Sequence, residues 1–145
     1  MSKRKKATLV NYKFESIRLN GGRFIKICDD MMKAMAWQKL SIRQRGLYLE
    51  LKRQFVSRSD GSTTELEIYI LHSQFKNNYK SKNTLFDDVD QLIENGFIKV
   101  VQHGKYARQP NIYGFTDEWK MYNTPEFFIH PNNKRLTNKN SYNEK

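Results

Sequence analysis

Apolar side chains recur along the first half of the chain at intervals that predict a strand pair followed by two helices. Two apolar clusters, at 14–19 and 24–27, flank Asn20-Gly21-Gly22, and this turn signal predicts a hairpin or strand pair that ends near residue 29. Acidic residues at 29 and 30 then precede a helical segment in which Met31 and Met35 share one face. Ser41 is a natural N-cap for a helix over about 42–55, with apolar positions at Leu47, Tyr48, Leu51 and Phe55. The polar segment 57–64 predicts a loop.

The second half of the chain predicts a strand, a short helix, a longer helix and a hairpin. Apolar and polar residues alternate over 66–70, which is the period of a strand, and a short helix is expected over 71–78. Ser81 offers an N-cap for a helix over 82–94, and Asn95-Gly96 is a stop signal. Strands at 97–101 and 111–115 flank a turn at 103–105, and Thr116 caps a last short helix that contains Trp119.

Two helices joined by a tight turn and followed by a hairpin are typical of a winged helix-turn-helix domain. The predicted fold class is therefore α+β, with this domain over residues 13–123 and a strand or hairpin extension at its N-terminal end. A basic arm over 1–12 precedes the domain, and a flexible tail over 124–145 follows it.

The charge distribution points to an anionic partner. The 145 residues include 26 Lys and Arg against 15 Asp and Glu, a formal net charge of +11. The excess lies at the two ends of the chain, in residues 1–26 and 120–145, and the middle is almost neutral. The single cysteine excludes an internal disulfide and predicts a reducing, cytoplasmic compartment. No apolar stretch approaches the ~18 residues of a membrane helix, and no secretory signal is expected.

Signals for catalysis are weak. No histidine lies at a zinc-ligand spacing from another histidine or cysteine, and Gly21-Gly22 lacks the context of a phosphate loop. The adjacent carboxylates at 29–30 and 87–88 point in different directions on a helix, so we expect them to cap helices or face solvent. The sequence therefore predicts neither an enzyme nor a cofactor or metal site.

Three stretches of sequence carry a resemblance to a known family: RFIKICDDMM with AWQKLSIRQRGLYLELKRQF, KSKNT with LIENGFIKVV, and RQPNIYGFTDEWKMY. Together they resemble small winged-helix proteins of plasmids, phages and conjugative elements of low-GC Gram-positive bacteria. Replication initiators, relaxosome accessory proteins at transfer origins, and regulators share this fold. The resemblance covers about two thirds of the chain and implies DNA binding.

The candidate DNA contacts fall in three regions. They are Lys3, Arg4, Lys5 and Lys6 in the arm; Lys80, Lys82, Asn83 and Thr84 at the tip of the 82–94 helix; and Lys99, Lys105, Tyr106 and Arg108 on the hairpin. The same helix carries four carboxylates, Asp87, Asp88, Asp90 and Glu94, which would repel phosphates. We expect this acidic flank to face a partner subunit, another protein or water.

The predicted function is sequence-preferring binding of double-stranded DNA in a mobile genetic element, as an accessory factor at a conjugative-transfer or replication origin. Expected partners are double-stranded DNA, a relaxase or replication or transcription proteins, and a second copy of the chain in a homodimer; no membrane is expected. Three alternatives stay open: a transcriptional regulator at an operator, a protein-interaction adaptor, and a binder of single strands or RNA.

Overall fold

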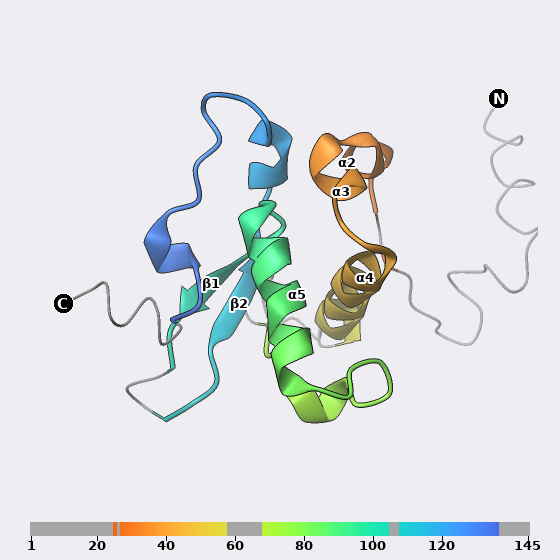
Figure 1. Cartoon of the computed structure of the whole chain (residues 1–145), viewed down its shortest axis with the longest axis vertical. Coiled ribbons are helices and arrows are strands. Elements are labelled where there is room, and N and C mark those ends of the chain that lie inside the picture. The colour runs from red at the N-terminus through yellow and green to blue at the C-terminus, as the bar shows by residue number, and fades with distance from the viewer. Residues whose placement is uncertain (1–24, 26, 58–67, 105–107, 137–145) are drawn as a thin grey trace, which may run out of the picture.

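The computed structural model describes residue 25 and residues 27–57, 68–104 and 108–136, and it is a mixed α+β fold (Figure 1). Several predicted segments lie outside this part: the basic arm, nearly all of the N-terminal hairpin, nearly all of the 57–64 loop, and residues 105–107 of the hairpin turn. In chain order the elements are α2 (Asp29–Lys33), α3 (Met35–Gln38), α4 (Ile42–Ser57), the 3-10 helix η3 (His72–Gln74), α5 (Lys82–Glu94), β1 (Ile98–Gln102), β2 (Ile112–Phe115), and the 3-10 helices η5 (Glu118–Met121) and η6 (Pro131–Asn133).

The two long helices begin where the sequence predicts. The Ser41 hydroxyl accepts a hydrogen bond from the Gln44 N–H (3.1 Å), and the Gln44 side chain accepts one from the Ser41 N–H (2.9 Å), which is a reciprocal capping box before α4. At the start of α5 the Ser81 side chain accepts hydrogen bonds from the N–H groups of Asn83 and Thr84. After α5 the chain turns at Gly96, whose φ of 86° is unfavourable for any residue with a Cβ.

The strands β1 and β2 form an antiparallel sheet with Ile98 opposite Phe115 and Val100 opposite Tyr113. The predicted strand at 66–70 is reduced, in its described part, to one bridge: Ile68 and Tyr113 exchange two backbone hydrogen bonds of 2.8 Å. This bridge sets the 68–70 segment beside β2, on the edge that β1 leaves free.

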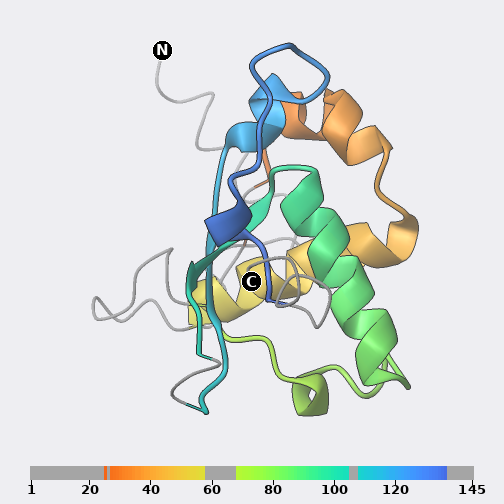
Figure 2. The same cartoon turned by 60° about the vertical axis from the view of Figure 1, so that its left-hand side comes forward.

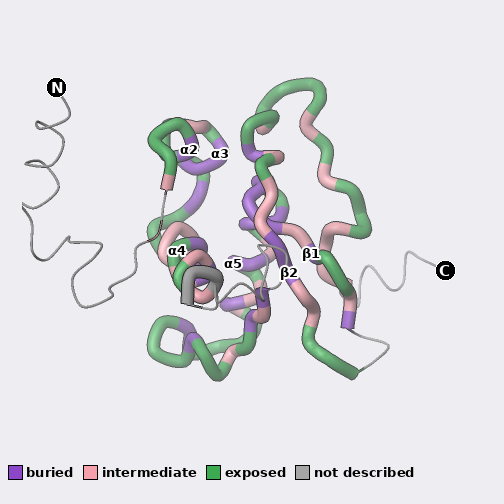
Figure 3. Tube along the Cα trace, turned by 180° about the vertical axis from the view of Figure 1, so that it is seen from behind, coloured by how far each residue is buried: buried purple, intermediate pink, exposed green. Residues whose placement is uncertain are grey.

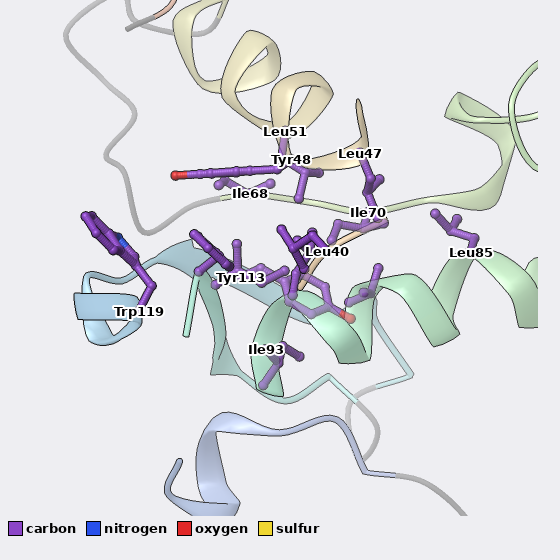
Figure 4. Close-up of a cluster of buried hydrophobic side chains, with 14 of the residues drawn as sticks. Leu40, Leu47, Tyr48, Leu51, Ile68, Ile70, Leu85, Ile93, Tyr113 and Trp119 are labelled. Atoms are coloured by element: carbon purple, nitrogen blue, oxygen red, sulfur yellow. The ribbon is translucent and has the colours of Figure 1, made fainter. Parts of the chain in front are cut away.

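The core lies between α4, α5, the 68–70 segment and the sheet. Side chains from all four converge there, including Leu51, Ile68, Leu85 and Tyr113, and all four are buried (Figure 4). An aromatic cluster closes one end, where Phe97 lies within 6.2 Å, between ring centroids, of Trp37, Tyr48 and Trp119. Figure 3 shows that the buried positions face this interior, whereas the turn after η3 and the loop after η5 are largely exposed.

Two local predictions differ from the structure. The expected single helix over 31–40 is divided into α2 and α3, because Ala34 adopts an extended conformation with ψ 147°. Met35 is therefore 49% exposed and does not share a buried face with Met31. The short helix expected over 71–78 contains only one 3-10 turn, His72–Gln74, followed by hydrogen-bonded turns.

The C-terminal segment is folded onto the domain as far as Leu136, although the sequence predicts a flexible tail from residue 124. Ile129 packs against the core, and η6 lies beside β1. His103 Nε2 donates a hydrogen bond to the backbone carbonyl of Asn132 (2.8 Å), and Arg135 reaches α5. Apart from Ile129, the contacts named here are polar, and the segment lacks apolar periodicity. The hydrophobic pattern therefore gives no sign that this segment attaches to the domain.

Candidate nucleic-acid interface

The N-terminal end of α5 presents polar side chains to solvent. Ser81 Oγ accepts hydrogen bonds from the backbone N–H groups of Asn83 (3.2 Å) and Thr84 (3.4 Å), so the cap occupies these two donors. The side chains of Lys80, Lys82 and Asn83 are exposed, and Thr84 is half-buried. None of the three exposed side chains forms an ion pair or hydrogen bond with another described residue. This tip therefore offers side chains, rather than the helix backbone, to a ligand.

Asp88 of α5 is buried, and this corrects the expectation that it faces solvent. Only 2% of the Asp88 surface is exposed. Its carboxylate accepts hydrogen bonds from Arg43 Nε (2.6 Å), the Tyr79 hydroxyl (2.6 Å) and Gln44 Nε2 (3.1 Å). Burial alone would raise the pKa of Asp88, but the hydrogen bonds from Arg43, Tyr79 and Gln44 outweigh it and hold that pKa below its ordinary value. The carboxylate is thus ionised and paired inside the protein.

Two further carboxylates of α5 are paired with the C-terminal segment. Arg135 donates two hydrogen bonds to Asp90, of 2.8 and 2.9 Å, and its guanidinium lies 4.7 Å from the ring centre of Phe86. Lys134 forms an ion pair with Glu94 (3.2 Å). The prediction that the acidic flank faces a partner or water is therefore wrong for Asp88, which is buried. The side chains of Asp90 and Glu94 stay partly exposed, but each is paired with a cation of the same chain.

Of the four carboxylates, Asp87 is the one that forms no ion pair with the described residues, and it is exposed. The negative charge that α5 presents to solvent is therefore much smaller than its sequence suggests, so the electrostatic objection to a nearby phosphate backbone is largely removed.

The hairpin formed by β1 and β2 approaches the tip of α5. In Figures 1 and 2 the start of β2 and the start of α5 lie toward the same end of the molecule. A cavity of about 530 Å³ separates them, lined by Lys82 and Phe86 from α5, by residues 109–111 from the hairpin, and by Arg135. Arg108, just before this stretch, is exposed and has a φ of 55°. The helix tip and this part of the hairpin thus share one surface.

Lys99, which was predicted to act with these residues, lies elsewhere. It lines a second cleft near the end of β2, together with Lys52 and Phe115. The structure therefore brings Lys80, Lys82, Asn83 and Thr84 toward Arg108 but separates Lys99 from that group. The other predicted contacts, Lys3, Arg4, Lys5, Lys6, Lys105 and Tyr106, lie outside the described residues.

Arg43 is a candidate contact that the sequence analysis missed. Its side chain is 54% exposed, yet Asp88 fixes two of its nitrogens and its guanidinium lies 5.6 Å from the ring centre of Tyr79. The Asp88 hydrogen bonds and charge raise the pKa of Arg43 further, so it stays cationic. A guanidinium held in one orientation beside α5 is well suited to a phosphate or a guanine edge. Only the 45-residue separation from Asp88 hides this pairing in the sequence.

Other kinds of site are not evident in the described part of the chain. There, no group of three His, Cys, Asp or Glu side chains is placed to hold a metal ion. Within the same ranges, no helix combines the length and apolar character needed to cross a bilayer. Comparison with known proteins finds no match for this chain among protein-family models, curated proteins or solved structures.

Proposed function

We propose that the protein binds double-stranded DNA through a winged helix-turn-helix domain, with α5 as the recognition helix and the β1–β2 hairpin as the wing. The element order supports this assignment: α4, the 68–70 segment, η3 with its turn, α5, and then the hairpin. The single bridge between Ile68 and Tyr113 sets the 68–70 segment beside the hairpin, and α5 packs against α4.

The observation that carries the proposal is the internal neutralisation of α5. Arg43, Lys134 and Arg135 pair with three of its four carboxylates, while Lys80 and Lys82 at its tip stay unpaired among the described residues. The helix thus presents cations at the end that would enter a major groove and little uncompensated negative charge along its length.

The proposed contacts divide into positioning and reading. Lys80, Lys82 and Arg108 bind phosphates and fix the register of the protein on the duplex, because lysine and arginine carry most backbone contacts. Asn83 at the helix tip reads an adenine edge, for which its amide offers a matching donor and acceptor. Arg43 contributes either a phosphate or a guanine contact from the side of α5. The basic arm at 1–12 extends the footprint along the backbone.

The biological role is proposed on the sequence resemblance: an accessory factor at a conjugative-transfer or replication origin of a mobile genetic element, in the cytoplasm. A regulator that binds an operator would use the same surface. The two roles differ in the DNA fragment that binds best and in the protein recruited, a relaxase or replication protein in one case and the transcription machinery in the other.

The proposal is tested by fluorescence anisotropy with labelled duplexes over a salt series. The variant K80Q/K82Q removes two cations from the tip. As a control of equal charge, K33Q/K39Q removes two exposed cations, one from α2 and one directly after α3, and neither of them lines a cleft. We expect the tip variant to reduce the slope of log affinity against log salt by about two, with a much smaller change in the control. Equal slopes in the two variants would contradict an α5-centred interface.

The competing DNA fragments are the duplex upstream of the protein's own gene and the origin region of its genetic element, with scrambled duplex and single strands as controls. A preference of roughly a thousandfold over scrambled duplex is expected for specific recognition. The fragment that wins separates the origin factor from the regulator, and a preference for single strands would overturn both.

A further inference from the structure

A second cleft, of about 540 Å³, lies at the end of β2 opposite to the α5 tip. It is lined by residues 115–117, at the end of β2 and just after it, whereas residues 109–111, which precede β2, line the cavity beside α5. The two sets of residues are therefore centred about 20 Å apart along an extended strand. Lys52 from α4 and Lys99 from β1 both border this second cleft, and Lys52 lies above the aromatic rings of Tyr48 and Phe115.

Both lysines lack a counter-ion among the described residues. Lys52 Nζ lies 4.5 Å from the ring centre of Phe115 and 5.8 Å from that of Tyr48, so its contacts are with ring faces rather than with carboxylates. Lys99 forms no ion pair within the same part of the chain. Asp117 also borders the cleft, but its carboxylate lies 3.6 Å from Lys120, a lysine outside the cleft lining.

Two half-buried lysines thus border one cleft, and an anion bound in it would be attracted by both positive charges. A hydroxyl is available as well: Thr116 Oγ1 accepts a hydrogen bond from the Glu118 N–H (3.3 Å), which leaves its own proton free to be donated. The cleft thus combines two cations and one neutral donor with an aromatic wall. Its volume is within the range of pockets that hold small ligands.

We propose that this cleft is a phosphate-binding site, in which Lys52, Lys99 and Thr116 bind the phosphate oxygens and the edge of Phe115 contacts the group that carries the phosphate. Ammonium and hydroxyl donors make short, charge-assisted hydrogen bonds to phosphate. The phosphate belongs either to a nucleotide-sized phosphomonoester or to the backbone of nucleic acid. The site is independent of the α5 tip, because it shares no lining residue with the first cavity.

Calorimetric titration with inorganic phosphate and with adenosine 5′-monophosphate tests the first source. We expect wild-type protein and K80Q/K82Q to bind adenosine 5′-monophosphate alike, and K52Q/K99Q to bind it about tenfold more weakly for each lysine removed, the loss of one charge-assisted hydrogen bond. Thr116→Val removes the hydroxyl at nearly constant volume and is expected to weaken binding without changing the net charge. It also serves as the test variant if K52Q/K99Q does not fold.

Anisotropy with duplex DNA tests the second source. If adenosine 5′-monophosphate does not bind but K52Q/K99Q weakens duplex binding more than the charge-matched K33Q/K39Q does, the phosphate comes from the DNA backbone. If K52Q/K99Q and Thr116→Val leave both nucleotide and duplex binding at wild-type values, the phosphate site is overturned. That result would leave the α5 interface untouched, since K80Q/K82Q reports on it separately.

Discussion

Substitution of Asp88 by alanine, compared with substitution of its exposed neighbour Asp87, measures how much the buried polar network stabilises the fold. Both variants remove one negative charge from the same helix, so their effects on net charge are equal. Their surroundings differ: Asp88 is 2% exposed and accepts four hydrogen bonds, whereas Asp87 faces solvent. The comparison therefore isolates burial and hydrogen bonding from charge.

The expected magnitude follows from the partners left behind. The Tyr79 residue is 2% exposed, and without Asp88 its hydroxyl loses the acceptor at 2.6 Å, at a cost of about 1–3 kcal/mol. The half-buried Gln44 amide loses a bond worth about 0.5–1.5 kcal/mol. The Arg43 side chain is half exposed and returns to water, and the alanine no longer carries the desolvation cost of a buried carboxylate. We expect Asp88→Ala to lower the free energy of unfolding by about 2–3 kcal/mol.

Urea denaturation followed by the fluorescence of the buried Trp37 and Trp119 provides the measurement. Asp87→Ala is expected to lie within about 0.5 kcal/mol of wild type, as exposed substitutions usually do. It should also raise duplex affinity, because it removes the unpaired carboxylate of α5. Equal destabilisation by the two variants would refute the network as the source of stability.

Three further outcomes are expected. Gly96→Ala destabilises by at least ~2 kcal/mol in chemical denaturation, because its φ is 86° and a Cβ would lie 2.5 Å from the Trp119 backbone nitrogen. Gly46→Ala, inside α4 with open space around it, instead stabilises the protein by about 0.5–1 kcal/mol. The variant K134Q/R135Q removes the cations paired with Glu94 and Asp90, so duplex affinity measured by anisotropy is expected to fall about tenfold at low salt. Unchanged affinity would mean that α5 does not face DNA. Because the pKa of Asp88 is lower in the folded protein than in the unfolded chain, the ionised carboxylate contributes its full stabilisation at neutral pH. In urea titrations the stability difference between wild type and Asp88→Ala should therefore shrink only as pH falls below about 4. A difference that stays constant into acid would contradict an ionised, paired Asp88.

The parts of the fold that local chemistry determines were predictable. Ser41 and Ser81 cap helices because their side chains lie next to the N–H groups they satisfy, and Gly96 ends α5 because the turn needs a positive φ. The hairpin strands follow from their apolar residues, and the helical turn expected at Trp119 is present as η5. Such signals lie within a few residues of the structure they specify.

The electrostatics of the candidate site were not predictable, because they depend on residues far apart in the chain. Arg43 pairs with Asp88, and Arg135 pairs with Asp90, each across 45 residues. Reading α5 alone therefore gives a helix with four carboxylates and suggests repulsion of DNA. Lys99 shows the same limitation: it belongs to the predicted hairpin, but only the packing of α4 reveals that it borders a cleft with Lys52.

The attachment of Arg135 to α5 has a consequence for the order in which the molecule matures on the ribosome. Asp90 is synthesised 45 residues before the arginine that neutralises it, so α5 carries an uncovered negative charge until the C-terminal segment has been made and has folded back. Under the proposed function, affinity for DNA would thus be acquired late, once Arg135 has paired with Asp90. A growing chain would then be kept off nucleic acid until its last described segment folds back onto the helix.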